Sequence, residues 1–345
     1  MKKWIIFMLA FTLGLLMVST VSASYEISPG LDFGKIEPGE NKTLKVSLKK
    51  TSAGLANINL PAHQSEFESG LILSTDSFPF GANINNGQSL SFEVTLIADE
   101  STDAVERDGD ELKPIDGKVG LFHVGTVVNG FPENPTFEVQ AEIENKLEIK
   151  DSDILVKRDI SGEKDRDADS GRISITDDRD IKVRPGDKLI IELEIQNKFS
   201  SKTDIDFDDV TVEIDIEDDE DFDFDEEPDS FSLDTKDEKT VTFELEVNED
   251  ADRDSHRVRI NLEGRTGAGG LHGETLEFDL DVERKSRDIA IRDLDISPDK
   301  IACDEEDRTV SVDFDIFNRG NSDEDEVAIE VSSQGLDFKE KQQDI

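Results

Sequence analysis

Cysteine, tryptophan and tyrosine are nearly missing from this chain of 345 residues, which has one of each. Because Cys303 is the only cysteine, an intrachain disulfide is excluded, and an exported form must be held together by apolar cores, metal ions or neighbours. The acidic residues that follow Cys303 disfavour its thiolate, so we interpret it as incidental. The 20 phenylalanines supply most of the aromatic core, and the scarcity of Trp and Tyr argues against a dedicated carbohydrate-binding groove.

Patterns for reaction chemistry are lacking as well. The four histidines are scattered, without the spacing of a zinc site. The chain has neither a Gly-x-Ser-x-Gly elbow nor a phosphate-cradling Gly-x-x-x-x-Gly-Lys loop. Paired carboxylates are too numerous to indicate glycosidase chemistry. We therefore expect a protein that is not an enzyme. The histidines are His63, His123, His256 and His272.

Positive charge is scarce, with 38 Lys and Arg against 83 Asp and Glu and a formal net charge of -45. Such a charge repels nucleic acid and anionic lipid, so neither is an expected partner, and it attracts cations, divalent ones above all. In a second interpretation the charge only solvates the surface, as in proteins of salt-adapted organisms.

Long hydrophobic runs are limited to the start of the chain. The apolar core Trp4–Val18 follows Lys2 and Lys3 and precedes small residues at 21–23, which predicts a signal peptide over residues 1–23. Its core of about 15 residues is shorter than the roughly 18–20 that span a bilayer, and an uncleaved anchor helix is the alternative. No transmembrane anchor is visible beyond the signal peptide, so we expect a secreted or extracellular cell-surface protein.

Strict alternation of apolar and polar residues replaces helical periodicity after the signal peptide. In residues 182–197, Leu189, Ile191, Leu193 and Ile195 point to one side of an extended chain, and mostly polar residues point to the other. Short alternating strands separated by turns predict an all-β fold made of β-sandwiches. Comparable runs occur at residues 43–48, 90–96, 118–128, 136–144, 210–216, 241–247, 258–262, 276–282 and 310–316.

Repetition of these runs divides the chain into modules. A Pro-Gly turn opens a strand at Pro38-Gly39 and again at Pro185-Gly186, and another alternating strand follows roughly 50 residues later in both cases. The junction at 147–154 is echoed at 289–296. We predict tandem immunoglobulin-like β-sandwich domains at residues 24–149 and 150–285, the second one acidic, after the signal peptide. Residues 286–345 would be an incomplete third repeat, because about 60 residues are too few for a sandwich of roughly 100.

Two segments carry a family resemblance. The segment Arg184–Asn197 and the segment Phe314–Gly320, which reads FDIFNRG, resemble CARDB (cell-adhesion-related) and S-layer-like immunoglobulin modules of archaeal and bacterial surface proteins. The likeness covers residues 150–345 and, more weakly, residues 25–149. The resemblance implies extracellular structural or adhesive modules without catalytic residues, and it provides no site to transfer.

One segment is a candidate calcium site. Asp165, Asp167 and Asp169 place three carboxylates where a turning backbone brings them together, which suits a hard cation such as Ca²⁺. Asp177 is the first candidate for a further ligand, and Asp178 or Asp180 could also supply it. The segment departs from an EF-hand loop, because Gly171 is one place late and no flanking helix is expected. A solvated acidic loop is the alternative.

The densest acidic run, residues 204–229, includes Phe222 and Phe224 among its carboxylates. Within it, residues 210–216 are expected to form a strand with an acidic outer side. Residues 217–227 are either a cation-bridged contact to a neighbouring molecule or a solvated, mobile loop whose two Phe side chains attach to the sandwich edge. We favour the second interpretation, because a run of like charges is usually a solvated surface.

Asn41 is the candidate glycosylation site. It begins the sequence Asn-Lys-Thr, the one N-glycosylation sequon in the chain with a permitted middle residue. We expect Asn41 to have an exposed turn position, which suits a glycan.

Together these features predict a non-catalytic structural protein of the cell surface. Its sandwiches would serve as spacer and contact modules of an S-layer or similar envelope assembly, with divalent cations bridging acidic faces to neighbouring subunits or to an envelope polymer. The alternatives are an adhesin or ligand-binding module whose loops grip a polysaccharide or protein, and the accessory modules of a secreted hydrolase whose catalytic part lies beyond residue 345.

Overall fold

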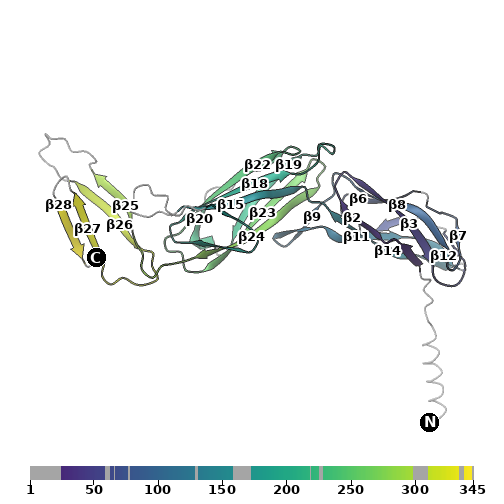
Figure 1. Cartoon of the computed structure of the whole chain (residues 1–345), viewed down its shortest axis with the longest axis horizontal. Helices are drawn as coiled ribbons and strands as arrows, with labels where there is room; N and C mark the ends of the chain where they lie inside the picture. Colours follow the sequence, from purple (N-terminus) through teal and green to yellow (C-terminus); the bar gives the residue numbers. More distant parts are fainter. Residues whose placement is uncertain are drawn as a thin grey trace, which may run out of the picture. The chain divides into compact units, whose positions relative to one another are not determined.

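The computed structural model describes residues 25–58, 63–65, 67–76, 78–128, 131–157, 172–217, 219–224, 228–297, 310–333 and 338–343 (Figure 1). In these ranges every element is a β-strand except one 3₁₀ turn, η1 (Asp219–Asp221), so the predicted all-β fold is confirmed. The predicted signal peptide and Cys303 lie outside the described residues.

Two compact units make up the chain. Unit 1 contains Met1–Lys146, Phe199–Asp208 and Gly264–Gly273, and unit 2 contains Leu147–Lys198, Asp209–Glu263 and Glu274–Ile345. Unit 1 therefore includes two segments that are distant in sequence from its main part.

The first sandwich is formed by two four-stranded sheets that enclose a core of alternating apolar side chains, among them Val46, Phe92 and Phe122. One sheet has the order β1 (Tyr25–Ser28), β3 (Asn41–Lys50), β8 (Ser89–Ala98) and β6 (Leu71–Asp76). The other has the order β2 (Leu31–Ile36), β14 (Thr136–Ile143), β11 (Asp116–His123) and β5 (His63–Ser65).

Two smaller elements accompany the first sandwich. A third four-stranded sheet, which we call the cap sheet, has the order β13 (Phe131–Glu133), β12 (Thr126–Val128), β4 (Ala56–Asn57) and β7 (Asn83–Ile84). A hairpin joins β9 (Val105–Asp108) to β10 (Glu111–Pro114). The predicted run 118–128 is thereby corrected: it divides into β11 and β12, which belong to different sheets.

The second sandwich is formed by two five-stranded sheets. One has the order β16 (Arg172–Ser174), β15 (Leu147–Lys157), β18 (Lys188–Asn197), β22 (Glu238–Val247) and β20 (Phe222–Phe224). The other has the order β17 (Arg179–Val183), β24 (Leu271–Val282), β23 (Ser255–Thr266), β19 (Phe207–Ile216) and β21 (Phe231–Leu233).

Both sandwiches have the same strand order. The order β1-β3-β8-β6 matches β15-β18-β22-β20, and β2-β14-β11-β5 matches β17-β24-β23-β19. In each, one strand near the start pairs in parallel with the last strand, β2 with β14 and β17 with β24. The pairings along β1-β3-β8-β6 and along β16-β15-β18-β22-β20 are antiparallel. A two-sheet antiparallel sandwich with long crossing connections is the immunoglobulin-like arrangement.

The predicted buried side of residues 182–197 is confirmed. Leu189, Ile191, Leu193 and Ile195 are each 0% exposed, because β18 lies between β15 and β22 and its inner side faces the second sheet. The Pro-Gly turns that precede β3 and β18 are alike. Gly39 and Gly186 have φ values of 89° and 79°, which suit a turn with proline before glycine.

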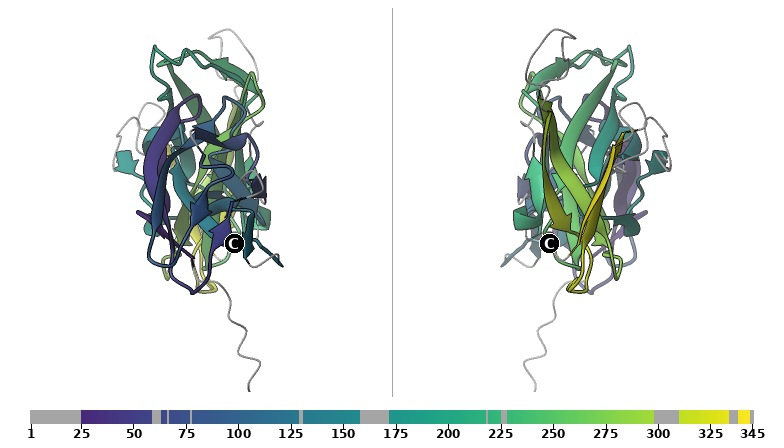
Figure 2. Two further views of the ribbon diagram at one scale, coloured as in Figure 1. Left: turned by 90° about the vertical axis from the view of Figure 1, so that its right-hand side faces the viewer. Right: turned by 90° about the vertical axis from the view of Figure 1, so that its left-hand side faces the viewer.

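The two junctions that the sequence indicated are strands. Residues 147–154 belong to β15, and 289–296 belong to β25 (Ile289–Ser297), which pairs with β26 (Ser311–Asn318). A second hairpin joins β27 (Ala328–Ser333) to β28 (Phe338–Gln343), and both hairpins are light green to yellow in Figures 1 and 2. The register of both strands shifts as at a β-bulge, in β15 between Ile149 and Asp151 and in β25 between Arg292 and Asp295, so the two strands are alike in this respect.

Candidate functional site

The structure describes one of the four predicted calcium ligands. Asp177 is exposed in a turn after β16, and Asp165, Asp167 and Asp169 lie outside the described residues. Within the ranges given above, no three His, Cys, Asp or Glu side chains gather closely enough to hold a metal ion. The calcium site stays a prediction.

Asn41, the predicted glycosylation site, is exposed at the first position of β3. Its backbone pairs with Ile97, and the hydroxyl of Thr43 lies 2.8 Å from that of Thr95. The expected turn position is therefore corrected: Asn41 is exposed, but the sequon is part of a paired strand. Occupancy by a glycan stays a prediction.

Part of the densest acidic run is ordered against the second sandwich. Phe222 is 6% exposed in β20, an edge strand paired with β22, and its ring meets that of His256 edge to face at 5.0 Å. Phe224 is less buried. The expected attachment to the sandwich edge is confirmed for Phe222, but over residues 219–224 a 3₁₀ turn and a strand replace the expected loop, because backbone pairing with β22 satisfies their polar groups.

Several acidic side chains on the second sandwich form ion pairs with arginine side chains. Arg257 contacts Asp279 at 2.7 Å and Glu277 at 3.0 Å, and Arg259 contacts Glu277 at 2.8 Å. The hydrogen bond from Arg259 holds the pKa of Glu277 below its usual value, against the opposing effect of burial. These pairs neutralise part of one sheet's outer side, while Asp215, 4.0 Å from Arg259, stays largely exposed.

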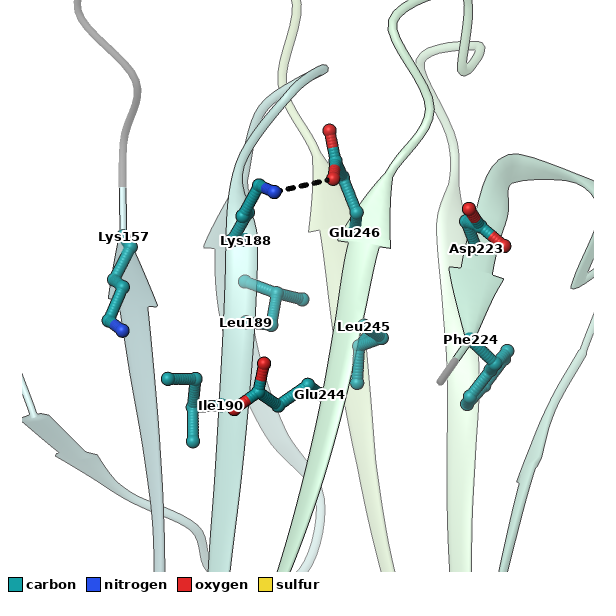
Figure 3. Close-up of a pocket in the computed structure, with 9 residues that line it drawn as sticks. All are labelled: Lys157, Lys188, Leu189, Ile190, Asp223, Phe224, Glu244, Leu245 and Glu246. Carbon is teal, nitrogen blue, oxygen red and sulfur yellow. Dashed lines mark ion pairs between the residues drawn. The ribbon is translucent and has the colours of Figure 1, made fainter. Parts of the chain in front are cut away.

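A small hollow opens at one end of the sheet that contains β18 (Figure 3). Its volume is about 170 Å³, below the roughly 300–1,000 Å³ of typical ligand pockets. Lys188 and Glu246 form a 3.1 Å ion pair across neighbouring strands at its rim, which leaves them less available to a ligand. We assign no small-molecule site there. The lining residues are Lys157, Lys188, Leu189, Ile190, Asp223, Phe224, Glu244, Leu245 and Glu246.

A buried polar cluster in unit 1 surrounds Lys146 and His272. The Lys146 ammonium lies 2.7 Å from Glu144 and 3.2 Å from Glu37, and these hydrogen bonds outweigh the effect of burial and raise its pKa. The backbone N–H of Lys146 donates to Nδ1 of His272, which is 0% exposed. The His272 ring meets the rings of Phe199 and Phe207 edge to face, both at 5.3 Å. Sequence reasoning missed this cluster, because His272 has no polar pattern around it.

A close contact between a Pro-Gly turn and a loop later in the chain occurs twice. In unit 1, a Cβ added at Gly39 would lie 3.4 Å from Ile205, in the loop that follows β18. In unit 2, a Cβ added at Gly186 would lie 3.1 Å from Arg319, in the loop that follows β26. Arg319 is 12% exposed and forms an ion pair with Glu249 at 3.6 Å. In both cases the loop after the strand that pairs with β15 or with β25 lies against a Pro-Gly turn earlier in the chain.

Strand β25 exposes positions whose counterparts in β15 are buried. Leu147 pairs with Asn197 and Ile289 pairs with Asn318, so the two residues occupy equivalent positions. Leu147 is 0% exposed, whereas Ile289 is 37% exposed. Ile154 and Ile296 are likewise 0% and 49% exposed. Both strands have an apolar side. Among the described residues, a second sheet covers that side of β15, whereas β25 belongs to a two-stranded sheet with β26.

The cap sheet contains a surface that sequence reasoning also missed. Residues 51–65, 77–92 and 119–132 contain no Asp, Glu, Lys or Arg, although 35% of the whole chain is charged. Three strands of the cap sheet, and most of the fourth, come from these stretches. The three stretches without charged residues are visible in the sequence. That they come together in one sheet depends on pairing between strands that are far apart in the chain.

Comparisons with known proteins do not assign the chain to a family. No protein-family model matches the chain, and no curated protein matches it. Among solved structures, the chain is similar to VesB protease of Vibrio cholerae at 14% identity and a TM-score of 0.24, over 37% of this chain and 34% of that one. The chain thus spans about a third of that protease. No helix among the described residues is long and apolar enough to cross a membrane.

Two further solved structures are similar over most of this chain. The titin domains Z1Z2 in complex with telethonin match at 11% identity, over 76% of this chain and 98% of that one, with a TM-score of 0.20. The sialic acid binding region of a Streptococcus sanguinis adhesin matches at 10% identity, over 76% and 78%, with a TM-score of 0.22. At these scores the likenesses carry no argument about function.

Proposed function

We propose that this chain is a non-catalytic structural protein of the cell surface, in which repeated sandwiches serve as spacer and contact modules of an S-layer or similar envelope assembly. The observation that carries the proposal is the recurring contact at the Pro-Gly turn. A chain that repeats both its sandwich and the contact to the preceding repeat is suited to extending a module series.

The acidic surface supports a mechanical and electrostatic role. Carboxylates such as Asp215 and Glu213 lie on the outer side of β19, where neighbouring molecules have access to them. Two such surfaces repel each other unless cations or salt intervene. We therefore propose that divalent cations bridge acidic faces to neighbouring subunits or to an envelope polymer, with the 165–169 segment as a candidate calcium site.

Sedimentation velocity of the chain from Ser24, with calcium and with chelator at matched ionic strength, tests the cation bridge. Large species that form with calcium and dissociate on chelation are expected. Equal sedimentation in both conditions would contradict cation bridging. Cell fractionation tests the location separately, and recovery of the protein from the cytoplasm would contradict a surface role.

An adhesin or ligand-binding module is the second candidate. It is favoured by exposed apolar side chains at the cap sheet, because an apolar patch on a sandwich end is a common interaction site. Leu55 is 49% exposed and Phe80 is 63% exposed there.

A further inference from the structure

One side of the cap sheet is uncharged; Asn83 and Pro132 are exposed on this side, and Asn57 and Val127 are partly exposed. Ala56, Ile84 and Val128 point inward and form a small core with Tyr25 and Leu90. Their neighbours along each strand therefore point outward, because successive side chains of a strand alternate. The outward residues form a row across four strands, Pro132 opposite Val127, Val127 opposite Asn57, and Asn57 opposite Asn83.

Two apolar side chains extend this row. Leu55 lies two places before Asn57 and is 49% exposed. The turn that carries Phe80 is held beside β4, since the N–H of Gly81 donates to the Ile58 carbonyl at 2.7 Å. Phe80 itself is 63% exposed. We call Leu55, Asn57, Phe80, Asn83, Val127 and Pro132 the uncharged face.

The uncharged face is held firmly on the sandwich. The Tyr25 hydroxyl donates to Thr126 at 3.2 Å, and the Thr126 hydroxyl donates to the Glu133 carbonyl at 2.9 Å. On the outward side, the Asn57 amide donates to Asn83 at 2.8 Å. Glu133, the acidic residue of β13, lies opposite the fully buried Thr126 and so on the inner side. The outward side therefore presents apolar and amide groups without charge.

We propose that the uncharged face is the surface through which one copy of this chain binds a second copy. A two-fold contact places the same patch on both partners, so the patch must complement itself. An acidic patch cannot do so without a cation, whereas apolar groups and amides, which both donate and accept hydrogen bonds, can. In a chain of net charge -45, this face is where two copies approach with the least repulsion.

This inference rests on the proposed role in an assembly and names one of its contacts. A six-residue patch belongs to the small, weak class of interfaces, below about 1,200 Å² in total. Weak contacts suffice in a layer, because each subunit is held at several places and the effective local concentration is high.

The salt dependence separates this contact from a cation bridge. Monovalent salt screens the long-range repulsion between two acidic copies, so it is expected to strengthen the uncharged contact. The same salt weakens a cation bridge, and a chelator abolishes it. Sedimentation velocity or small-angle scattering of the chain from Ser24, from about 10 µM to about 1 mM with chelator present, measures the dimer population.

Two variants test the face itself. Asn83→Asp keeps the oxygen that accepts from Asn57 and adds one negative charge per copy, and Phe80→Ser removes the apolar ring. Each is expected to lower the association constant of the dimer at least about tenfold. The like charges that Asn83→Asp brings together, or the apolar burial that Phe80→Ser removes, cost more than about 1.4 kcal/mol. The matched controls are Asn41→Asp and Ile72→Ser, both exposed outside the cap sheet, and they are expected to leave it unchanged.

A monomer at the highest concentration, or equal weakening by variants and controls, overturns the proposal. Association that disappears on chelation also overturns it and supports the cation bridge instead. Chelator-resistant association that Asn83→Asp weakens and salt strengthens supports the uncharged contact even if the calcium test fails. Unchanged thermal unfolding of each variant confirms that its fold is intact.

Discussion

Unit 1 is expected to lose stability as the pH falls below about 6.5, because His272 can take up a proton in the unfolded chain but stays neutral in the folded one. Burial, with a smaller contribution from the Lys146 charge, lowers the pKa of His272 from 6.5 to about 3. Because Nδ1 accepts the N–H of Lys146, the proton of the neutral ring lies on Nε2, and a second proton would break this hydrogen bond. The folded state therefore disfavours the charged ring.

The sign of the effect follows from the lowered pKa. Above pH 6.5 the ring is neutral in both states, and its contribution to stability is complete. As the pH falls from 6.5 toward 3, the unfolded chain takes up a proton that the folded chain does not, and stability is lost. At 1.36 kcal/mol per pKa unit, the loss between pH 7 and pH 5 is about 2 kcal/mol.

Urea unfolding at pH 7 and pH 5 measures this loss. After removal of residues 1–23, Tyr25 is the sole Tyr or Trp of the chain and belongs to unit 1, so its fluorescence follows that unit. His272→Asn removes the titrating ring and keeps a side-chain acceptor for the Lys146 amide. The wild type should lose about 2 kcal/mol more than this variant over the interval. Equal pH dependence of the two proteins would refute the reasoning.

Three further predictions concern stability and use thermal or urea unfolding as the measurement. Gly186→Ala should cost about 1–3 kcal/mol, because the residue has φ +79° and its new Cβ would lie 2.5 Å from a glutamate oxygen; Gly87→Ala, with the same φ and open space, should cost less. Leu193→Ala, at a fully buried position, should cost about 2–5 kcal/mol, whereas Leu294→Ala, 60% exposed, should change stability by under about 0.5 kcal/mol. Lys146→Ala should cost about 3–5 kcal/mol, because it leaves two glutamates without their buried cation, and a loss below about 1 kcal/mol would show that water screens them.

The strands were predictable where the chain alternates over many residues. Residues 182–197 and 241–247 have a period of two that belongs to the extended backbone itself, so local sequence suffices to assign the inner side. Strand β15 was missed as a strand because its bulge after Ile149 interrupts the alternation. The Pro-Gly turns were predictable for the same local reason, since their residues set the required backbone angles.

The candidate sites were less predictable. Asp165, Asp167 and Asp169 form a recognisable pattern and remain a prediction, whereas His272 has no neighbouring pattern at all. Its burial results from Phe199 and Phe207, more than 60 residues earlier in the chain. The uncharged face was partly predictable. Its stretches without charged residues are visible in the sequence, but its strands are two or three residues long and too short to predict.

By itself the sequence determined the all-β class, the inner side of the long strands, the position of the turns and the acidic character of the surface. These properties depend on neighbouring residues along the chain. Only the tertiary structure decided which strands pair, that Leu147 is buried while Ile289 is exposed, and that three separate uncharged stretches meet in one sheet. The reason is that pairing and burial depend on partners tens of residues away, and a local pattern of period two fits many partners equally well.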